Sequence, residues 1–327
     1  MSLSRKTLSA VILSGALALT SCAGENAEAE TAAETLSIDY ATYNPLSLII
    51  KDQGWLEEEL DGDVEWVYSA GSNRANENLR AEAIDVGSTA GSAALLARST
   101  GTPIQTISVV GNVEWTALVV PQDSDIESVE DLQGRAVAAT RGTDPYFFLV
   151  QAVEEAGLEL DDLEVQNVQH ADGYTALNNG SVDAWAGLDP IMAGAEDDTE
   201  FLYRNVDLNT YSFLNATESF LEESPEVAQT VVDTYERARE WALENPAETA
   251  QLLADEGEIE EDVAEIVINE RSGFDISPVP GEDQTEVLSN ISSIFVTSGD
   301  VDNQENVDEA LETLLRPEFA ENAESAE

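Results

Sequence analysis

The sequence is poor in the side chains from which most metal sites are built. Its 327 residues include one cysteine, Cys22, and one histidine, His170. A zinc site rich in cysteine or histidine therefore cannot be assembled in the usual way, and the spacing of the acidic residues matches no calcium-binding loop. We expect neither a bound metal ion nor a cofactor.

Basic residues are almost as scarce. The chain has 13 lysines and arginines against 67 aspartates and glutamates, a net charge of −54, and Lys51 is its only lysine after residue 6. Nucleic acid is excluded as a partner, because no cationic patch is available to meet phosphates. The acids are scattered over nearly every expected helix, which is typical of the solvated surface of a halophilic protein, where salt screens their mutual repulsion.

Long apolar runs are missing beyond the N-terminal leader, so no membrane span is expected there. The leader itself has two basic residues followed by an apolar run over residues 8–19, which predicts a secretory signal peptide over residues 1–21. The run ends in Leu-Thr-Ser-Cys, which resembles a bacterial lipobox, so Cys22 is expected to carry lipid. Residues 22–34 are rich in Ala, Glu and Thr and predict a flexible tether. We therefore expect a protein anchored by lipid to the extracytoplasmic face of the cell membrane.

Short β-type runs alternate with helical patterns over the rest of the chain, which predicts an α/β fold. This part has roughly 290 residues, which suits two domains rather than one. Strands are expected at residues 36–40, 64–68, 84–88, 104–110, 115–120, 136–139, 163–168, 182–186 and 211–214. Helices are expected at residues 73–83, 91–99, 144–156, 173–178, 225–244, 246–255, 259–269, 282–298 and 307–315, with others beginning near 45, 128 and 190. The tail beyond Pro317 is polar and is expected to be frayed.

One local arrangement recurs: a strand, a loop of small residues, and the start of a helix. It follows Tyr40, Tyr68, Ser88, Ala139 and Ala186. Each helix start offers unpaired backbone N–H groups and the positive end of a helix dipole. Several of them in one crevice would make a site for an anion or a strongly polar group.

Several short motifs, in order, resemble one family. They lie at residues 40–44, 69–71, 84–89, 126–137, 141–143, 180–185, 189–190 and 269–271. The family is that of the substrate-binding lipoproteins of ABC importers for aliphatic sulfonates, nitrate, taurine and thiamine precursors. The resemblance implies a two-lobed periplasmic binding protein type II fold with two hinge crossings, near residues 115–120 and 211–216. The first lobe would hold residues 35–118 and 216–327, and the second residues 119–215.

The resemblance also implies a set of ligand-binding residues in the cleft between the lobes: Asn44, Ser69, Ser88, Thr89, Arg141, Gly142, Thr143, Trp185, Asp189 and Arg271. In that set, Arg141 would supply a positive fork for sulfonate oxygens, and Trp185 an apolar wall. Asp144 departs from the family's pattern. An acid at that helix start would repel an anion if its side chain faces the cleft. Otherwise it is a first-turn acid stabilised by the helix dipole.

The resemblance implies a protein that captures a small organic anion without catalysis and delivers it to a membrane permease. An aliphatic sulfonate is the first expectation, and taurine, nitrate or a thiamine-precursor pyrimidine are alternatives; the protein is expected to be a monomer. A ligand-dependent surface sensor and a secreted carboxylate-dependent hydrolase remain as competing hypotheses. The histidine and cysteine-rich segment of the pyrimidine-making enzymes related to this family are missing here.

Overall fold

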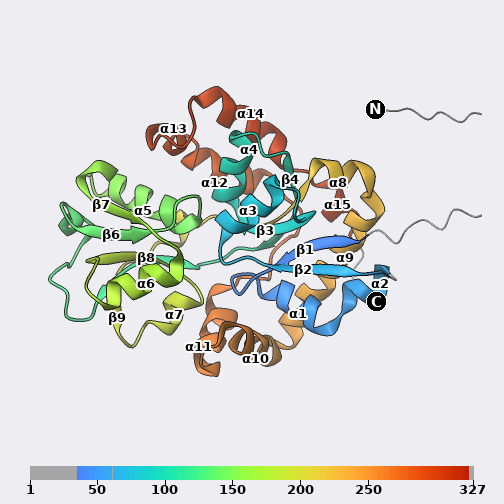
Figure 1. Ribbon diagram of the computed structural model, residues 1–327, viewed down its shortest axis with the longest axis horizontal. Coiled ribbons are helices and arrows are strands. Elements are labelled where there is room, and N and C mark those ends of the chain that lie inside the picture. Colours follow the sequence, from blue (N-terminus) through green and yellow to red (C-terminus); the bar gives the residue numbers. More distant parts are fainter. Residues whose placement is uncertain (1–34, 61, 324–327) are drawn as a thin grey trace, which may run out of the picture. The chain divides into compact units, whose positions relative to one another are not determined.

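Two five-stranded sheets organise the described part of the computed structural model, residues 35–60 and 62–323 (Figure 1). The signal peptide, Cys22 and the tether were expected within residues 1–34 and lie outside the described residues. In the described part, no helix has both the length and the apolar composition needed to cross a membrane.

The first sheet has the strand order β2-β1-β3-β10-β4. Strand β1 (Leu36–Tyr40) pairs in parallel with β2 (Val64–Tyr68) and β3 (Val86–Ala90). Strand β10 (Ser212–Thr217) runs antiparallel between β3 and β4 (Ile104–Gly111). We call this sheet and the helices that cover it the first lobe.

The second sheet repeats this order with other strands, β7-β6-β8-β5-β9. Strand β6 (Ala136–Ala139) pairs in parallel with β7 (Glu164–Asn167) and β8 (Ala184–Leu188). Strand β5 (Thr116–Pro121) runs antiparallel between β8 and β9 (Thr199–Tyr203). This sheet and its helices form the second lobe, so the α/β class and the division into two lobes are as expected.

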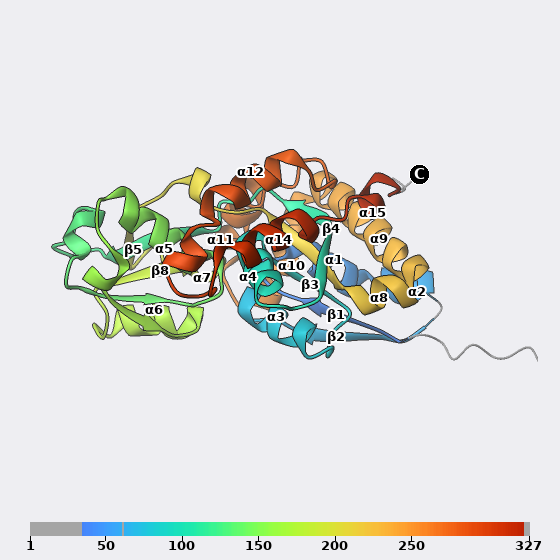
Figure 2. The ribbon, with the colours of Figure 1, turned by 90° about the horizontal axis from the view of Figure 1, so that it is seen from above.

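Helices cover both faces of the first sheet, as Figures 1 and 2 show. One face is packed by α1, α9 and α10, and the other by α3 and α4, because their apolar side chains enter the same clusters as the strands. The bounds in this lobe are α1 Pro45–Gln53, α2 Trp55–Leu60, α3 Ser72–Arg80, α4 Gly91–Ser99, α8 Glu218–Glu223, α9 Pro225–Glu244, α10 Pro246–Gly257, α11 Glu261–Ile266, α12 Glu282–Ile291, α14 Gln304–Leu314 and α15 Glu318–Glu321.

The second lobe has shorter helices. They are α5 Asp144–Glu155, α6 His170–Asn178 and α7 Ile191–Gly194, with single turns at Val129–Leu132, Leu160–Asp162 and Val206–Leu208. Helix α13 (Ile294–Thr297) comes from the C-terminal part of the chain but packs on α5, where the rings of Phe295 and Phe147 are 4.7 Å apart. The C-terminal part therefore contacts both lobes, whereas the sequence placed it in the first lobe.

The two crossings lie beside the expected positions rather than in them. Strand β5 is bonded along its whole length to the second sheet, and β10 to the first. The chain therefore crosses between the sheets at residues 112–115 and 204–211, just before each of these strands. The lobe boundaries at 118 and 216 remain predictions, and these registers favour moving them to about 115 and 211.

Some element predictions were wrong. Strand β9 and helix α15 were missed, and the expected frayed tail folds instead because Phe319 is buried, 5 % exposed. The helix expected at 259–269 is α11 followed by a π-helical segment, Val267–Arg271, and the helix expected at 282–298 breaks between α12 and α13. Helix α6 begins three residues before the expected Gly173.

Candidate functional site

The candidate site is a small chamber between the lobes, beside the first crossing. We call it the hinge chamber. It is lined by Thr42, Tyr43, Pro45, Val110, Val113, Trp115, Asp189, Ser212, Val267, Arg271, Ser272 and Phe274. Its volume of about 20 Å³ is enough for a water-sized group and too small for a whole organic solute.

Two aromatic residues form the apolar wall of the hinge chamber. Tyr43 follows β1, and Trp115 ends the first crossing; their rings meet edge to face with centroids 6.1 Å apart. The Tyr43 hydroxyl donates to the carbonyl of Ser88 at 3.0 Å, which fixes the ring. Both rings are almost fully buried. Such rings present a large, rigid surface to the organic part of a ligand.

An ion pair that joins the lobes also lines the hinge chamber. Arg271, in the π-helical segment, donates to both oxygens of Asp189 at 3.1 and 3.2 Å, and also to Glu196. Asp189 follows β8 in the second lobe, and Asp189 and Arg271 are each 5 % exposed or less. Burial raises the pKa of Asp189 to about 6, although Arg271 opposes this rise.

The segment that carries Arg271 is held against the first crossing. The amide of Glu114 donates to the carbonyl of Arg271 at 2.9 Å, and the amide of Asn112 donates to the carbonyl of Gly273 at 3.0 Å. Gly273 has φ of +54°, and a Cβ there would lie 1.8 Å from the carbonyl oxygen of Asn112. Glycine is therefore required at this contact.

Asp144 lies where both lobes and both crossings meet. Its carboxylate accepts from the Ser92 hydroxyl at 2.6 Å, the Trp115 indole N–H at 2.8 Å, and the Thr210 amide and hydroxyl at 2.9 and 2.6 Å. It is 1 % exposed, and burial raises its pKa against these hydrogen bonds. Asp144 is thus both the first residue of α5, as expected, and a contact between the lobes.

A buried carboxyl group also lies behind the ends of β1 and β3. Asp39 is fully buried and accepts from the Ser88 amide at 2.8 Å and from the Ser88 hydroxyl at 3.2 Å. Burial raises the pKa of Asp39 to about 7, against the opposing hydrogen bonds from Ser88.

The expected residues of the first lobe turn inward. Asn44, Ser69, Ser88 and Thr89 all have no exposed surface. Asn44 donates to the Tyr235 hydroxyl at 3.2 Å, and the Thr89 hydroxyl donates to a neighbouring backbone carbonyl. None of these four lines the hinge chamber, so their role in ligand binding remains a prediction.

The expected residues of the second lobe are divided. Asp189 lines the hinge chamber, but Arg141 pairs with Asp300 at 3.3 Å and its side chain is 45 % exposed. Trp185 is buried inside the second lobe, where a Cβ on Gly173 would lie 2.7 Å from its indole nitrogen. Neither Arg141 nor Trp185 lines the hinge chamber. The apolar wall is made by Trp115 and Tyr43 instead.

The loop of Gly142 and Thr143 lies at the edge of the interlobe contact. The Thr143 hydroxyl donates to the Thr140 carbonyl at 2.6 Å, which leaves Thr143 without a free donor on its side chain. Gly142 lines a shallow groove between α3 and α4. A Cβ built on Gly142 would lie 3.9 Å from the Cβ of Asn73. Neither lines the hinge chamber, and both remain predicted ligand contacts.

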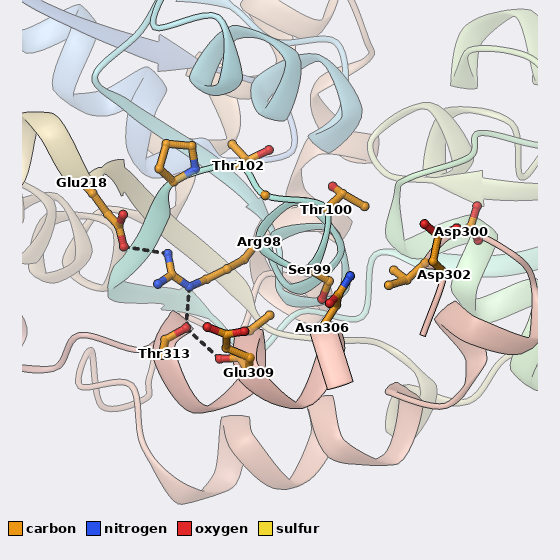
Figure 3. A pocket seen from close by; sticks show the side chains of 14 residues that line it. Arg98, Ser99, Thr100, Thr102, Glu218, Asp300, Asp302, Asn306, Glu309 and Thr313 are labelled. Carbon is orange, nitrogen blue, oxygen red and sulfur yellow. Dashed lines mark hydrogen bonds and ion pairs between the residues drawn. The ribbon is translucent and has the colours of Figure 1, made fainter. Parts of the chain in front are cut away.

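A wider groove lies on the outside of the first lobe (Figure 3). It has a volume of about 630 Å³, and Arg98 extends into it from α4. The guanidinium is already paired with Glu218 at 2.9 Å and with the Thr313 hydroxyl at 2.8 Å, as the dashed lines in Figure 3 show. The remaining lining is mostly acidic and polar, and this groove is not between the lobes.

Sequence reasoning missed Tyr43, Ser212 and the contact of His170 with the first lobe. The His170 Nε2 atom lies about where a side chain on Gly71 would go, 3.0 Å from the position of a Cβ. Burial lowers the pKa of His170 to about 4. The available signals were the small residues at 69–71 and the position of Tyr43, three residues after the end of β1. Among the described residues, no three acidic, histidine or cysteine side chains are grouped to hold a metal ion.

Known proteins resemble this chain in sequence and in fold. A family model described as NMT1/THI5-like matches residues 47–249. A relative from Escherichia coli, provisionally named an aliphatic sulfonates-binding protein, is 27% identical over 259 residues, which are 78% of this chain and 81% of the relative.

Two solved structures share the fold. The alkanesulfonate-binding protein SsuA from Xanthomonas axonopodis pv. citri, bound to MOPS, has a TM-score of 0.76 at 21% identity, covering 84% of this chain and 97% of that one. The periplasmic aliphatic sulphonate binding protein SsuA from Escherichia coli has a TM-score of 0.74 at 23% identity, covering 90% and 94%. At these identities, the likeness establishes the fold alone.

Proposed function

Because this chain belongs to the NMT1/THI5-like family, we propose that it is the extracytoplasmic solute-binding protein of an ABC importer. Its solute is a small organic anion, with an aliphatic sulfonate as the first choice, because the relative with 27% identity is named for that class. The chain binds this solute and does not transform it. Taurine, nitrate and a thiamine-precursor pyrimidine are the alternative solutes.

One observation carries the proposal. Two sheets of the same strand order are joined by two crossings, and a chamber with aromatic walls lies between them at the crossings. In such an arrangement, a rotation about the crossings opens the cleft, and a solute that contacts both lobes favours the closed form. A membrane permease that recognises the closed form would then receive the loaded protein.

Contacts between the lobes support a closed form that is held at the hinge. Asp144 takes hydrogen bonds from Ser92 in the first lobe and from Trp115 and Thr210 in the crossings. These bonds keep the aromatic wall beside the second lobe. The solute therefore has to bring only the outer parts of the two lobes together, which lowers the entropic cost of closure.

We place the protein outside the cytoplasm, held at the membrane by lipid on Cys22. Expression with the natural leader in a bacterium tests this placement. The wild type should fractionate with membranes and incorporate radiolabelled palmitate, and the Cys22→Ala variant should do neither. Palmitate incorporation by the variant would contradict the anchor, but not solute binding.

Calorimetric titration of the folded chain tests solute binding. The panel is hexanesulfonate, taurine, nitrate and 4-amino-2-methylpyrimidine, each at neutral pH and in molar KCl. Saturable binding of one member with a one-to-one ratio is the expected result. Conversion of any bound compound to a product would contradict the assignment of binding without catalysis, and no binding by the whole panel would contradict these solutes.

A further inference from the structure

Two buried polar atoms in the hinge chamber have no hydrogen-bond partner among the residues that the structure describes. They are Nε of Arg271 and Oγ of Ser212. Their residues are 5 % and 1 % exposed, and both line the hinge chamber. Leaving such a buried group unpaired is costly, so native structures nearly always give it a partner. These two atoms therefore indicate a polar contact supplied from outside the chain.

The chemistry of the two atoms defines that contact. The N–H at Nε of Arg271 can only donate, whereas the Ser212 hydroxyl can donate or accept. A group that serves both must be a hydrogen-bond acceptor. The volume of about 20 Å³ admits the end of a molecule rather than the whole of it.

The charge around Arg271 selects an uncharged acceptor. One terminal nitrogen of its guanidinium already faces Asp189, and the other faces Glu196. The described residues that line the hinge chamber include no second basic side chain, and Asp144 is bonded to Trp115 just beyond the wall. An anion in this position would add a further negative charge to a buried site whose one cation is already neutralised.

We propose that the hinge chamber receives an uncharged acceptor oxygen or nitrogen at one end of the solute, bonded to Nε of Arg271 and to Oγ of Ser212. This assignment rests on the proposed function, and it makes the solute a sulfonate with a neutral polar group at the end remote from the sulfonate. Ser212 is then a determinant of specificity, and the rings of Tyr43 and Trp115 contact the end of the solute that enters the hinge chamber.

Three probes with the same carbon chain test the chemistry of this end. They are hexanesulfonate, 5-oxohexanesulfonate and hexane-1,6-disulfonate. Relative to hexanesulfonate, the second has a carbonyl group in place of the methylene at carbon 5, and the third has a second sulfonate on carbon 6. In calorimetric titrations, the carbonyl probe should bind the wild type about tenfold more tightly than hexanesulfonate, because it gains a bond to a charged donor. The disulfonate should bind most weakly. Tightest binding of the disulfonate would overturn the choice of an uncharged group.

The variant Ser212→Ala tests the residue. It should reduce the affinity of 5-oxohexanesulfonate relative to hexanesulfonate by roughly three- to tenfold. The melting temperature of the unliganded protein should stay equal or rise, because no hydrogen bond within the chain is lost. The matched control is Ser108→Ala. Ser108 is also 1 % exposed and lies on the neighbouring strand β4, but its hydroxyl is directed to Pro278.

The outcomes separate this inference from the proposed function. If Ser212→Ala keeps the full advantage of the carbonyl probe, or if Ser108→Ala loses it equally, the assignment of Ser212 is wrong. If taurine, nitrate or the pyrimidine binds while all three probes fail, the inference is overturned and solute binding stands. If none of these compounds binds, the proposed function fails together with the inference.

Discussion

Removing the Asp144 carboxylate should destabilise the folded chain far more than removing an ordinary acid from the first turn of a helix. The carboxylate accepts four hydrogen bonds, from three residues that lie in the first lobe and in the two crossings. The perturbation is Asp144→Ala, which takes away every acceptor at this point and introduces no new polar group.

The magnitude follows from which donors can find another partner. The hydroxyls of Ser92 and Thr210 can rotate towards other acceptors. The indole N–H of Trp115 and the amide of Thr210 are fixed by the ring and the backbone, and each costs about 1–3 kcal/mol when buried without a partner. The carboxylate itself no longer has to be desolvated, which offsets part of this cost. We expect a net loss of about 3 kcal/mol, which corresponds to a melting temperature lower by on the order of 5–10 °C.

The matched control is Asp172→Ala. Asp172 is also an acid in the first turn of a helix, α6, but it is exposed. It should contribute only its interaction with the helix dipole, about 0.3–1 kcal/mol. Urea unfolding of both variants and the wild type, at one pH and one salt concentration, gives the comparison. If Asp144→Ala costs no more than Asp172→Ala, the carboxylate does not hold the lobes and crossings together, and this reasoning is refuted.

Three further predictions concern pH, arginine and salt. Burial raises the pKa of Asp39 from 3.8 to about 7. The folded state therefore holds the Asp39 proton more tightly than the unfolded state does. The stability that this difference gives at low pH is lost as the pH rises from about 4 to 7. Asp39→Asn should therefore be more stable than the wild type by about 2–4 kcal/mol at pH 8 and equal to it near pH 4; the same difference at both pH values in urea unfolding would contradict this. Arg271→Ala leaves Asp189 buried without its cation and should lower the free energy of unfolding by about 3–5 kcal/mol. Arg141→Ala breaks a half-exposed ion pair and should lower it by less than about 1 kcal/mol. The melting temperatures of the two variants should follow the same order. Raising KCl from 0.1 to 2 M should stabilise the wild type against urea, because the Debye length falls from about 10 Å to below about 3 Å, and a loss of stability would argue against a halophilic surface.

The sequence predicted much of the fold because its elements are locally encoded. The strand at Leu36–Tyr40 and the helix at Pro225–Glu244 coincide with the expected ranges. The crossings were predicted near residues 115–120 and 211–216, which include most of β5 and β10, because the apolar pattern of such a strand does not say which sheet it joins. The strand β9 was missed because its residues, Thr-Glu-Phe-Leu-Tyr, are only partly buried and give a weak pattern.

The candidate site was predicted less well, because its contacts join distant parts of the chain. Asp189 and Arg271 were both expected in the cleft, with an interlobe clamp as the alternative for Arg271, but no local pattern names Asp189, 82 positions away, as its partner. The donors that surround Asp144 lie 29 to 66 positions away, so only its place at the start of α5 could be foreseen. Arg141 was the expected anion contact, yet its partner, Asp300, comes from the C-terminal part of the chain.

A crystal structure of the chain grown with 5-oxohexanesulfonate tests the central claim most directly. The claim is that a small solute is held between the two lobes, against the walls of the hinge chamber. Density for the solute should lie beside Tyr43 and Trp115, with the carbonyl oxygen within hydrogen-bond distance of Arg271 and Ser212. Solute density in the outer groove around Arg98, or anywhere else on the protein but not between the lobes, would contradict the claim.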